Sequence, residues 1–266
     1  MLGTWKRNLK EFDLDINGSS VRVATDDNPI QNRPYIVFLH DSLGCISLWK
    51  DLPIQLGEMT NCNLLVYDRI GYGKSDPFAS KTRNNSYLED EADYLIKILQ
   101  KLNIKKVILF GHSDGGSIAL ITASRYPSYI LGVISEGAHV FVEEITIEGI
   151  LKAKEIFKTT KLKQILEKYH GYKTEDIFNA WVDTWLSQNF RNWNIEYLLP
   201  SIKCPVLVLQ GEFDEYGTEK QVDAIANAVS GKSIKKMIPN AKHTPHKEKP
   251  EIIMEDISNF INSFLP

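Results

Sequence analysis

A series of strand-length, continuously apolar runs constrains the fold of this 266-residue chain most strongly. A strand with one wet face alternates polar and apolar residues, whereas a parallel strand covered on both faces is apolar throughout. Amphipathic segments with helical spacing separate these runs, which predicts an α/β fold with a doubly wound, mostly parallel sheet. The predicted strands are 35–39, 64–67, 107–110, 130–134 and 206–209, and the predicted helices are 87–102, 115–123, 219–229 and 250–264.

Residues 10–16 and 20–25 have a different pattern, in which polar and apolar residues alternate. Asn17-Gly18 joins the two segments, and this dipeptide is typical of a tight hairpin turn. The chain therefore opens with a predicted antiparallel pair that has one face in water.

The segment from Val140 to Pro200 interrupts the alternation of strands and helices. It contains no convincing parallel strand, and helix-like stretches follow one another at 147–158, 162–169 and 174–188. We interpret 140–200 as a helical cap inserted into a core made of 1–139 and 201–266. The aromatic residues of this segment are Trp181, Trp185, Phe190, Trp193 and Tyr197. We expect them to pack the cap on the core, and we expect one or two of them to line a pocket.

Composition excludes several classes of protein. The 31 basic and 34 acidic residues give a formal charge of −3, which provides no electrostatic footprint for nucleic acid. No apolar run approaches the roughly 18 residues of a membrane span, and residues 1–18 lack the apolar stretch of a secretory signal. The three cysteines, Cys45, Cys62 and Cys204, follow no metal-ligand spacing. We therefore expect reduced, buried thiols and a cytoplasmic location.

The motif Gly111-His112-Ser113-Asp114-Gly115 carries the strongest chemical signal. It lies between an apolar strand and an apolar helix, which is the setting of a nucleophile elbow. Side chains two residues either side of the serine would collide with backbone in so tight a turn, and glycine removes them. The turn would expose the Ser113 hydroxyl beside the N-terminus of a helix.

A serine hydroxyl is a weak nucleophile at neutral pH and needs a base that is held by an acid. In this strand-turn-helix architecture the expected chain order is Ser, then Asp or Glu, then His. Asp214 follows the last strongly apolar run, and His243 lies in the loop before the final helix, so we predict a triad of Ser113, Asp214 and His243. The alternatives are His246 for the base and Glu212, Glu215 or Glu136 for the acid. His112 and His139 are expected to be structural.

Two further motifs complete a family resemblance. His40-Asp41-Ser42-Leu43-Gly44 resembles the H-G-x-x-G loop of α/β-hydrolase-fold enzymes, and 68–75 (DRIGYGKS) resembles their D-x-x-G-x-G-x-S turn. The similarity covers nearly the full chain. It implies that the N–H groups of Ser42 and Asp114 form an oxyanion hole, that His40 braces its loop, and that the 68–75 turn is structural. The chain departs from the pattern at Asp41 and Lys242, where the family usually has glycine.

These residues predict a hydrolase that cleaves a carboxylic ester of a small or medium acyl substrate through an acyl-enzyme on Ser113. The same machinery also serves thioesters, amides and carbon–carbon bonds, and the fold could instead serve as a small-molecule receptor without turnover or as a structural scaffold. No metal or organic cofactor is expected. The Asp114 carboxylate either supports the helix that starts there or binds a cationic group of the substrate. The sequence leaves the oligomeric state open.

Overall fold

The computed structural model describes residues 7–80 and 82–265 and contains an eight-stranded sheet in the order β1-β2-β4-β3-β5-β6-β7-β8. β1 pairs with β2 and β2 with β4 in the antiparallel sense, and the remaining pairs are parallel. The predicted doubly wound, mostly parallel sheet is therefore confirmed. The strands are β1 (Leu9–Ile16), β2 (Ser19–Asp26), β3 (Tyr35–Leu39), β4 (Asn63–Tyr67), β5 (Val107–His112), β6 (Ile130–Glu136), β7 (Val206–Gly211) and β8 (Ser233–Ile238).

The opening hairpin also has the predicted form. Asn17 and Gly18 both have positive φ, 55° and 83°, as a two-residue turn between twisted strands requires. The turn brings Ile16 opposite Ser19, and the pairing continues to Leu9 opposite Asp26.

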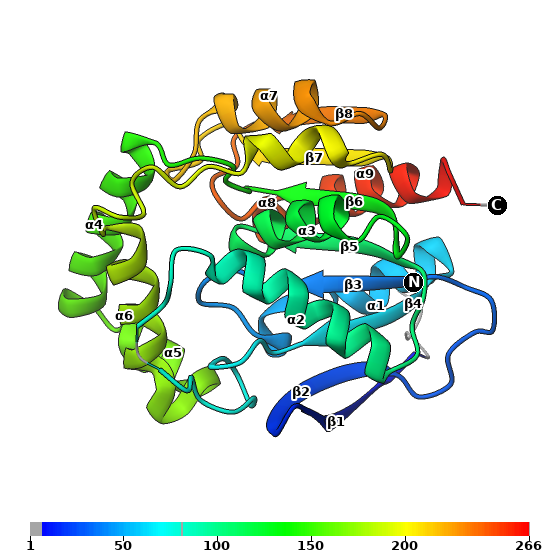
Figure 1. Ribbon diagram of the computed structural model, residues 1–266, viewed down its shortest axis with the longest axis horizontal. Coiled ribbons are helices and arrows are strands. Elements are labelled where there is room, and N and C mark those ends of the chain that lie inside the picture. Colours follow the sequence, from blue (N-terminus) through cyan, green and yellow to red (C-terminus); the bar gives the residue numbers. More distant parts are fainter. Residues whose placement is uncertain (1–6, 81, 266) are drawn as a thin grey trace.

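Helices cover both faces of the sheet (Figure 1). One buried cluster packs α2, α3 and α7 on one face, and a second packs α1 and α9 on the other. The inner strands are therefore buried on both sides, which explains why they are continuously apolar. The helices of the core are α1 (Leu52–Thr60), α2 (Tyr87–Lys101), α3 (Asp114–Arg125), α7 (Glu219–Ala228), α8 (Pro245–Glu248) and α9 (Pro250–Asn262).

The segment predicted as a cap lies beyond the carboxyl ends of the parallel strands (Figure 1). It contains α4 (Glu144–Thr159), α5 (Leu162–His170), the short 3₁₀ helix η2 (Gly171–Lys173), α6 (Thr174–Trp185) and the 3₁₀ helix η3 (Glu196–Ser201). In the described part of this segment the only β pairing is a single bridge between Phe141 and Asn194. The segment is therefore mainly helical, as predicted.

The aromatic residues of the cap behave as expected with one exception. Trp185, Phe190 and Trp193 are buried and pack on one another. Phe190 and Trp193 stack, and Trp185 meets both rings edge to face. The expectation for Tyr197 was wrong, because its side chain is 69% exposed on η3 and packs no core. A 3₁₀ helix has three residues per turn, so residues two apart face different sides. Leu199 faces the core in η3, and Tyr197 faces away from it.

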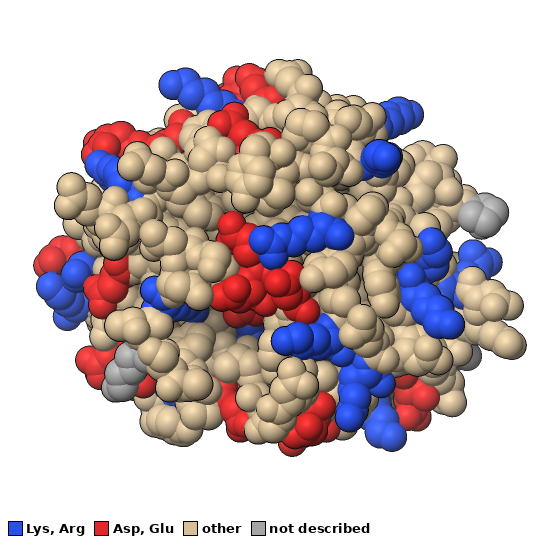
Figure 2. Space-filling view, in the orientation of Figure 1, with Lys and Arg blue, Asp and Glu red and all other residues tan. Residues whose placement is uncertain are grey.

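The surface and the cysteines add three further observations. Within the described residues no helix combines the length and apolar character needed to cross a membrane. Basic and acidic side chains are interspersed over the face in Figure 2, so no field of a single sign covers it. The three cysteines are unpaired; Cys45 and Cys62 are buried and Cys204 is partly exposed. Residues 1–6, which belong to the N-terminal stretch predicted to lack a secretory signal, lie outside the described residues.

Candidate active site

Ser113 occupies a strained turn between β5 and α3. Its φ of 56° and ψ of −120° lie in a region that L-residues rarely adopt. The conformation is held by its surroundings, since the Ser113 N–H donates to the Glu136 carbonyl at 2.8 Å and its own carbonyl accepts from Gly116 and Ser117. Strain of this kind persists only where packing fixes it, and it is concentrated at functional sites.

The two glycines of the motif have the steric role predicted for them. A Cβ atom on Gly111 would lie 2.0 Å from the Gly115 carbonyl oxygen, and one on Gly115 would lie 1.9 Å from the Leu39 carbonyl oxygen. Both clashes are with backbone, which cannot move aside as a flexible side chain does. The turn therefore requires glycine at both positions.

We predict that Gly115→Ala lowers the free energy of unfolding by about 3 kcal/mol or more, because the added methyl group forces β3 and α3 apart. The measurement is urea unfolding followed by circular dichroism. Gly217→Ala is the matched control, since its nearest contacts would be 3.4 Å, an ordinary van der Waals distance. Equal stability of the two variants would contradict this account of the turn.

Asp214 and His243 form a hydrogen-bonded pair. The His243 Nδ1 lies 2.9 Å from Asp214 Oδ1 and 3.0 Å from Oδ2, and Oδ1 also accepts from the Tyr216 N–H at 2.9 Å. Burial disfavours a charge on the imidazole, but the Asp214 carboxylate outweighs it and raises the pKa of His243. Burial likewise opposes the carboxylate charge, and His243 holds the pKa of Asp214 below its usual value. Nδ1 therefore carries a proton, and Nε2 is left to act as a base.

Ser113 and His243 line one cavity of about 340 Å³ between the cap and the strand ends. Trp181, Trp185 and Ile150 of the cap form part of its wall. His139, predicted to be structural, also lines this cavity, and its Nε2 donates to the Tyr216 carbonyl at 3.0 Å. Two cap tryptophans reach the pocket, in agreement with the expectation that one or two of the cap aromatics do.

The predicted oxyanion-hole residues, Ser42 and Asp114, line the same cavity. Among residues 7–80 and 82–265, no group accepts a hydrogen bond from the backbone N–H of Ser42 or of Asp114. Ser42 follows β3 and Asp114 is the first residue of α3, so the two donors come from neighbouring parallel strands. Uncommitted N–H groups beside a nucleophile are what stabilisation of an oxyanion requires.

Asp41 replaces the usual glycine without strain. Its φ is not positive, and its Oδ1 accepts from the Leu43 N–H at 2.9 Å, so the side chain closes the turn that leads to Ser42. Its carbonyl accepts from the His40 Nδ1 at 2.8 Å and from the Arg69 Nη2 at 2.9 Å. His40 thus braces the loop, as the resemblance implied. The neighbouring His112 holds the pKa of Asp41 well below its usual range despite burial, so the carboxylate is ionised.

The Asp114 carboxylate already has partners. Its Oδ2 accepts from the Tyr87 hydroxyl at 3.0 Å, and the same hydroxyl accepts from the Trp185 Nε1 at 2.9 Å. The buried guanidinium of Arg69 lies 3.8 Å away. The Oδ2 atom of this side chain therefore ties the start of α3 to α2 and to the cap.

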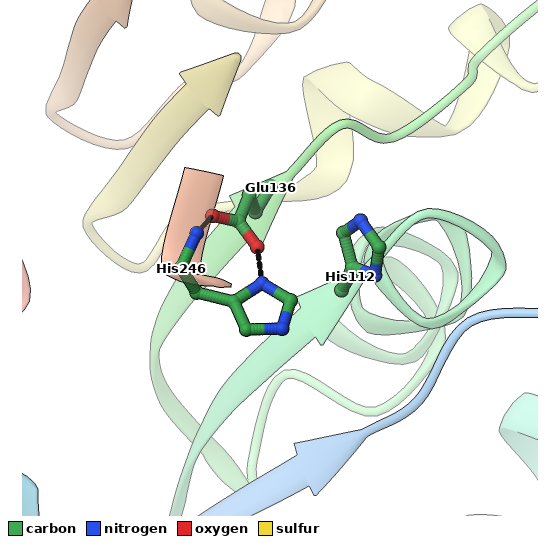
Figure 3. A group of neighbouring side chains, drawn as sticks. All are labelled: His112, Glu136 and His246. Atoms are coloured by element: carbon green, nitrogen blue, oxygen red, sulfur yellow. Dashed lines mark hydrogen bonds and ion pairs between the residues drawn. The ribbon is translucent and has the colours of Figure 1, made fainter. Parts of the chain in front are cut away.

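The rival base, His246, and the rival acid, Glu136, pair with each other (Figure 3). Glu136 accepts from the His246 N–H at 2.8 Å and from its Nδ1 at 2.5 Å, and both side chains are buried. His246 also holds the pKa of Glu136 below its usual value against the effect of burial. Neither residue lines the cavity that contains Ser113. Of the two glutamates that flank Asp214 in sequence, Glu215 lines the cavity, whereas Glu212 accepts from the Asn240 N–H.

His112, Glu136 and His246 also form a group that could hold a metal, with possible ligand atoms within 4.8 Å of one another. In Figure 3 both Glu136 oxygens face His246, and the ring of His112 stands apart from that pair. The His112 Nε2 donates to the His243 carbonyl at 2.7 Å. A metal would have to break these buried contacts, so the arrangement fits a structural ion pair better than a coordination site.

Comparison with known proteins agrees with this fold. Residues 34–154 match the family described as alpha/beta hydrolase fold. The chain therefore has the alpha/beta hydrolase fold. It is 32% identical over 192 residues to the serine hydrolase BPHL of Homo sapiens, in an alignment that covers 69% of this chain and 64% of that protein. The aligned part is thus less than two thirds of that relative's length.

Two further likenesses cover more of the chain. The proline iminopeptidase of Heyndrickxia coagulans is 26% identical over 94% of this chain and 98% of that protein. A crystal structure of a membrane phospholipase A superposes with a TM-score of 0.78 at 17% identity, covering 97% of this chain and 87% of that one. At 17% identity this superposition shows only that the two chains share a fold.

The sequence did not predict the contacts that several residues make in or beside the cavity. Tyr216 packs on the His243 ring, with ring centroids 4.7 Å apart, and its N–H holds Asp214. Its place two residues after the acid is the one signal that could have identified it. Arg69 and Tyr87 lie far from Ser113 in sequence, and no spacing rule connects them with it.

Proposed function

We propose that this alpha/beta hydrolase is a serine hydrolase that cleaves a carboxylic ester of a small or medium acyl substrate. The observation that carries the proposal is the hydrogen-bonded Asp214–His243 pair, which opens into the same cavity as Ser113 on its strained turn. The name of the human relative, a serine hydrolase, supports the same class of chemistry.

In the proposed reaction, His243 Nε2 takes the hydroxyl proton of Ser113 while Oγ attacks the ester carbonyl carbon. The carbonyl oxygen becomes an oxyanion held by the N–H groups of Ser42 and Asp114, each worth about 3 kcal/mol of barrier. The C–O bond to the alcohol breaks, and the leaving oxygen takes the proton from Nε2. Water then gives a proton to Nε2 and attacks the acyl carbon, and the bond to Oγ breaks as the proton returns to Ser113.

The cavity volume supports a substrate of limited size. About 340 Å³ lies near the lower end of the usual range for small-molecule sites, and the cap tryptophans give one wall a large apolar surface. An acyl chain can pack on these indole rings. The second candidate function is hydrolysis of an amide bond. The likeness to a proline iminopeptidase supports it, because that alignment covers nearly the whole chain.

The test is a panel of p-nitrophenyl esters from acetate to laurate, with matched thioesters and anilides, on the purified protein. We expect the highest kcat/KM for short or medium esters and a fluorophosphonate adduct that mass spectrometry locates on Ser113. A product burst of one equivalent without turnover would instead indicate a receptor. No adduct and no product would overturn the proposal.

A further inference from the structure

His170 connects the cap to the loop that carries Ser42. It is the last residue of α5 and is buried. Its Nε2 lies 2.9 Å from the Leu43 carbonyl oxygen, and its Nδ1 lies 3.0 Å from the backbone nitrogen of Gly73 in the 68–75 turn. One imidazole thus joins three segments that are about 30 to about 130 residues apart in the chain.

The partners of His170 determine its tautomer. The Leu43 carbonyl can only accept, so Nε2 carries the proton, and the Gly73 N–H can only donate, so Nδ1 is bare. The ring is therefore neutral when both bonds are made. Burial has the same effect, since it lowers the pKa of His170.

The two ends of the Ser42 turn are held from different sides. The Asp41 carbonyl is fixed by His40 and Arg69, which belong to the core. Among the described residues, the Leu43 carbonyl is held by His170 alone, which belongs to the cap. Leu43 is the third residue of the β-turn that the Gly44 N–H closes on the Asp41 carbonyl at 3.2 Å, so its orientation affects the placement of Ser42.

We propose that His170 is a positioning residue, through which the seating of the cap sets the geometry of the oxyanion hole. This inference rests on the proposed function for its kinetic readout. When the cap helices move away, the Leu43 carbonyl loses its partner and the turn relaxes, so the hole is complete only while the cap is seated. Substrate would then be turned over efficiently only once enclosed.

Lys173 provides a matched control from the same part of the cap. It is also buried, and its Nζ donates to the Tyr72 carbonyl at 3.1 Å and to the Ser75 carbonyl. It therefore attaches the cap to the 68–75 turn, as His170 does, but it does not touch the loop of Ser42.

The test uses two amide replacements of similar size. In His170→Asn the short side chain reaches the place of Nδ1 and keeps the Gly73 bond but loses Leu43, whereas the amide of His170→Gln reaches Leu43. We expect kcat to fall about 10-fold in His170→Asn with KM within about 3-fold, and to stay within about 3-fold in His170→Gln and Lys173→Met. Equal kcat losses in all three variants, or none in His170→Asn, would overturn the proposal.

A second readout does not depend on any substrate. Hydrogen exchange with mass spectrometry should show faster exchange of the peptide around 39–45 in His170→Asn than in His170→Gln. Thermal melts show whether each variant is folded. If the wild-type protein lacks hydrolase activity, the proposed function fails while this comparison still decides the link between cap and loop. Equal exchange in both variants would refute that link.

Discussion

Ser113→Ala is expected to abolish ester turnover while the fold survives. Serine hydrolases that lose the nucleophile drop by about 10⁴- to 10⁶-fold in kcat, because oxyanion stabilisation and binding remain but no acyl-enzyme forms. Alanine fits the turn as serine does, since both carry one Cβ, so the positive φ is no more costly. The measurement is kcat on the best p-nitrophenyl ester, together with a thermal melt of the same preparation.

Ser135→Ala is the matched control for this change. Ser135 is buried on β6 near the elbow, and its Oγ makes no hydrogen bond to the described residues. It should keep kcat within about 3-fold of the wild type. If the two serine variants lost activity equally, or if Ser113→Ala kept it, the acyl-enzyme mechanism would be untenable.

The sheet could be predicted from sequence because burial on both faces leaves a local signature. The run at 35–39 coincides with β3, and the other predicted strands lie within β4, β5, β6 and β7. The helix α1 (Leu52–Thr60) was missed, since Pro53 and Gly57 make it resemble a loop. In the structure Pro53 lies in the first turn, where a missing N–H costs nothing.

The candidate site divides along similar lines. Ser113 could be named because its glycines are dictated by local sterics, and the hydrogen bond between Asp214 and His243 joins the two partners chosen by chain order. The assignment of roles within the triad stays a prediction. The pairing of Glu136 with His246 spans 110 residues, and no local pattern indicates such a contact. This pairing gives the second histidine, His246, a buried partner of its own beside His243.

Contacts between the cap and the core could not be predicted for the same reason. The position of His170 between Gly73 and Leu43 depends on how α5 packs, which the helical period of 162–169 does not determine. The role of the Asp41 side chain could not be predicted either. Sequence identified it as a departure, whereas only the structure shows its carboxylate closing the turn.

Asp214→Asn is expected to lower kcat by about 10⁴-fold and to move the acid limb of the pH profile. In the variant the amide oxygen is kept by the Tyr216 N–H, so the NH₂ group takes the place of Oδ2, 3.0 Å from His243 Nδ1. A donor there favours the tautomer with the proton on Nε2, which cannot accept the proton of Ser113. The imidazolium that forms during the reaction also loses its counter-charge.

The direction of the pH shift follows from the pKa of His243. The base works when neutral, so activity rises as pH increases through that pKa, which Asp214 raises above its usual value. Without the carboxylate the pKa falls, and the rise in kcat/KM occurs at lower pH. Glu215→Gln removes the neighbouring cavity carboxylate and should cost less than about 3-fold. A larger loss in Glu215→Gln than in Asp214→Asn would transfer the role of the acid to Glu215, and an unmoved acid limb in Asp214→Asn would show that His243 is not the titrating base.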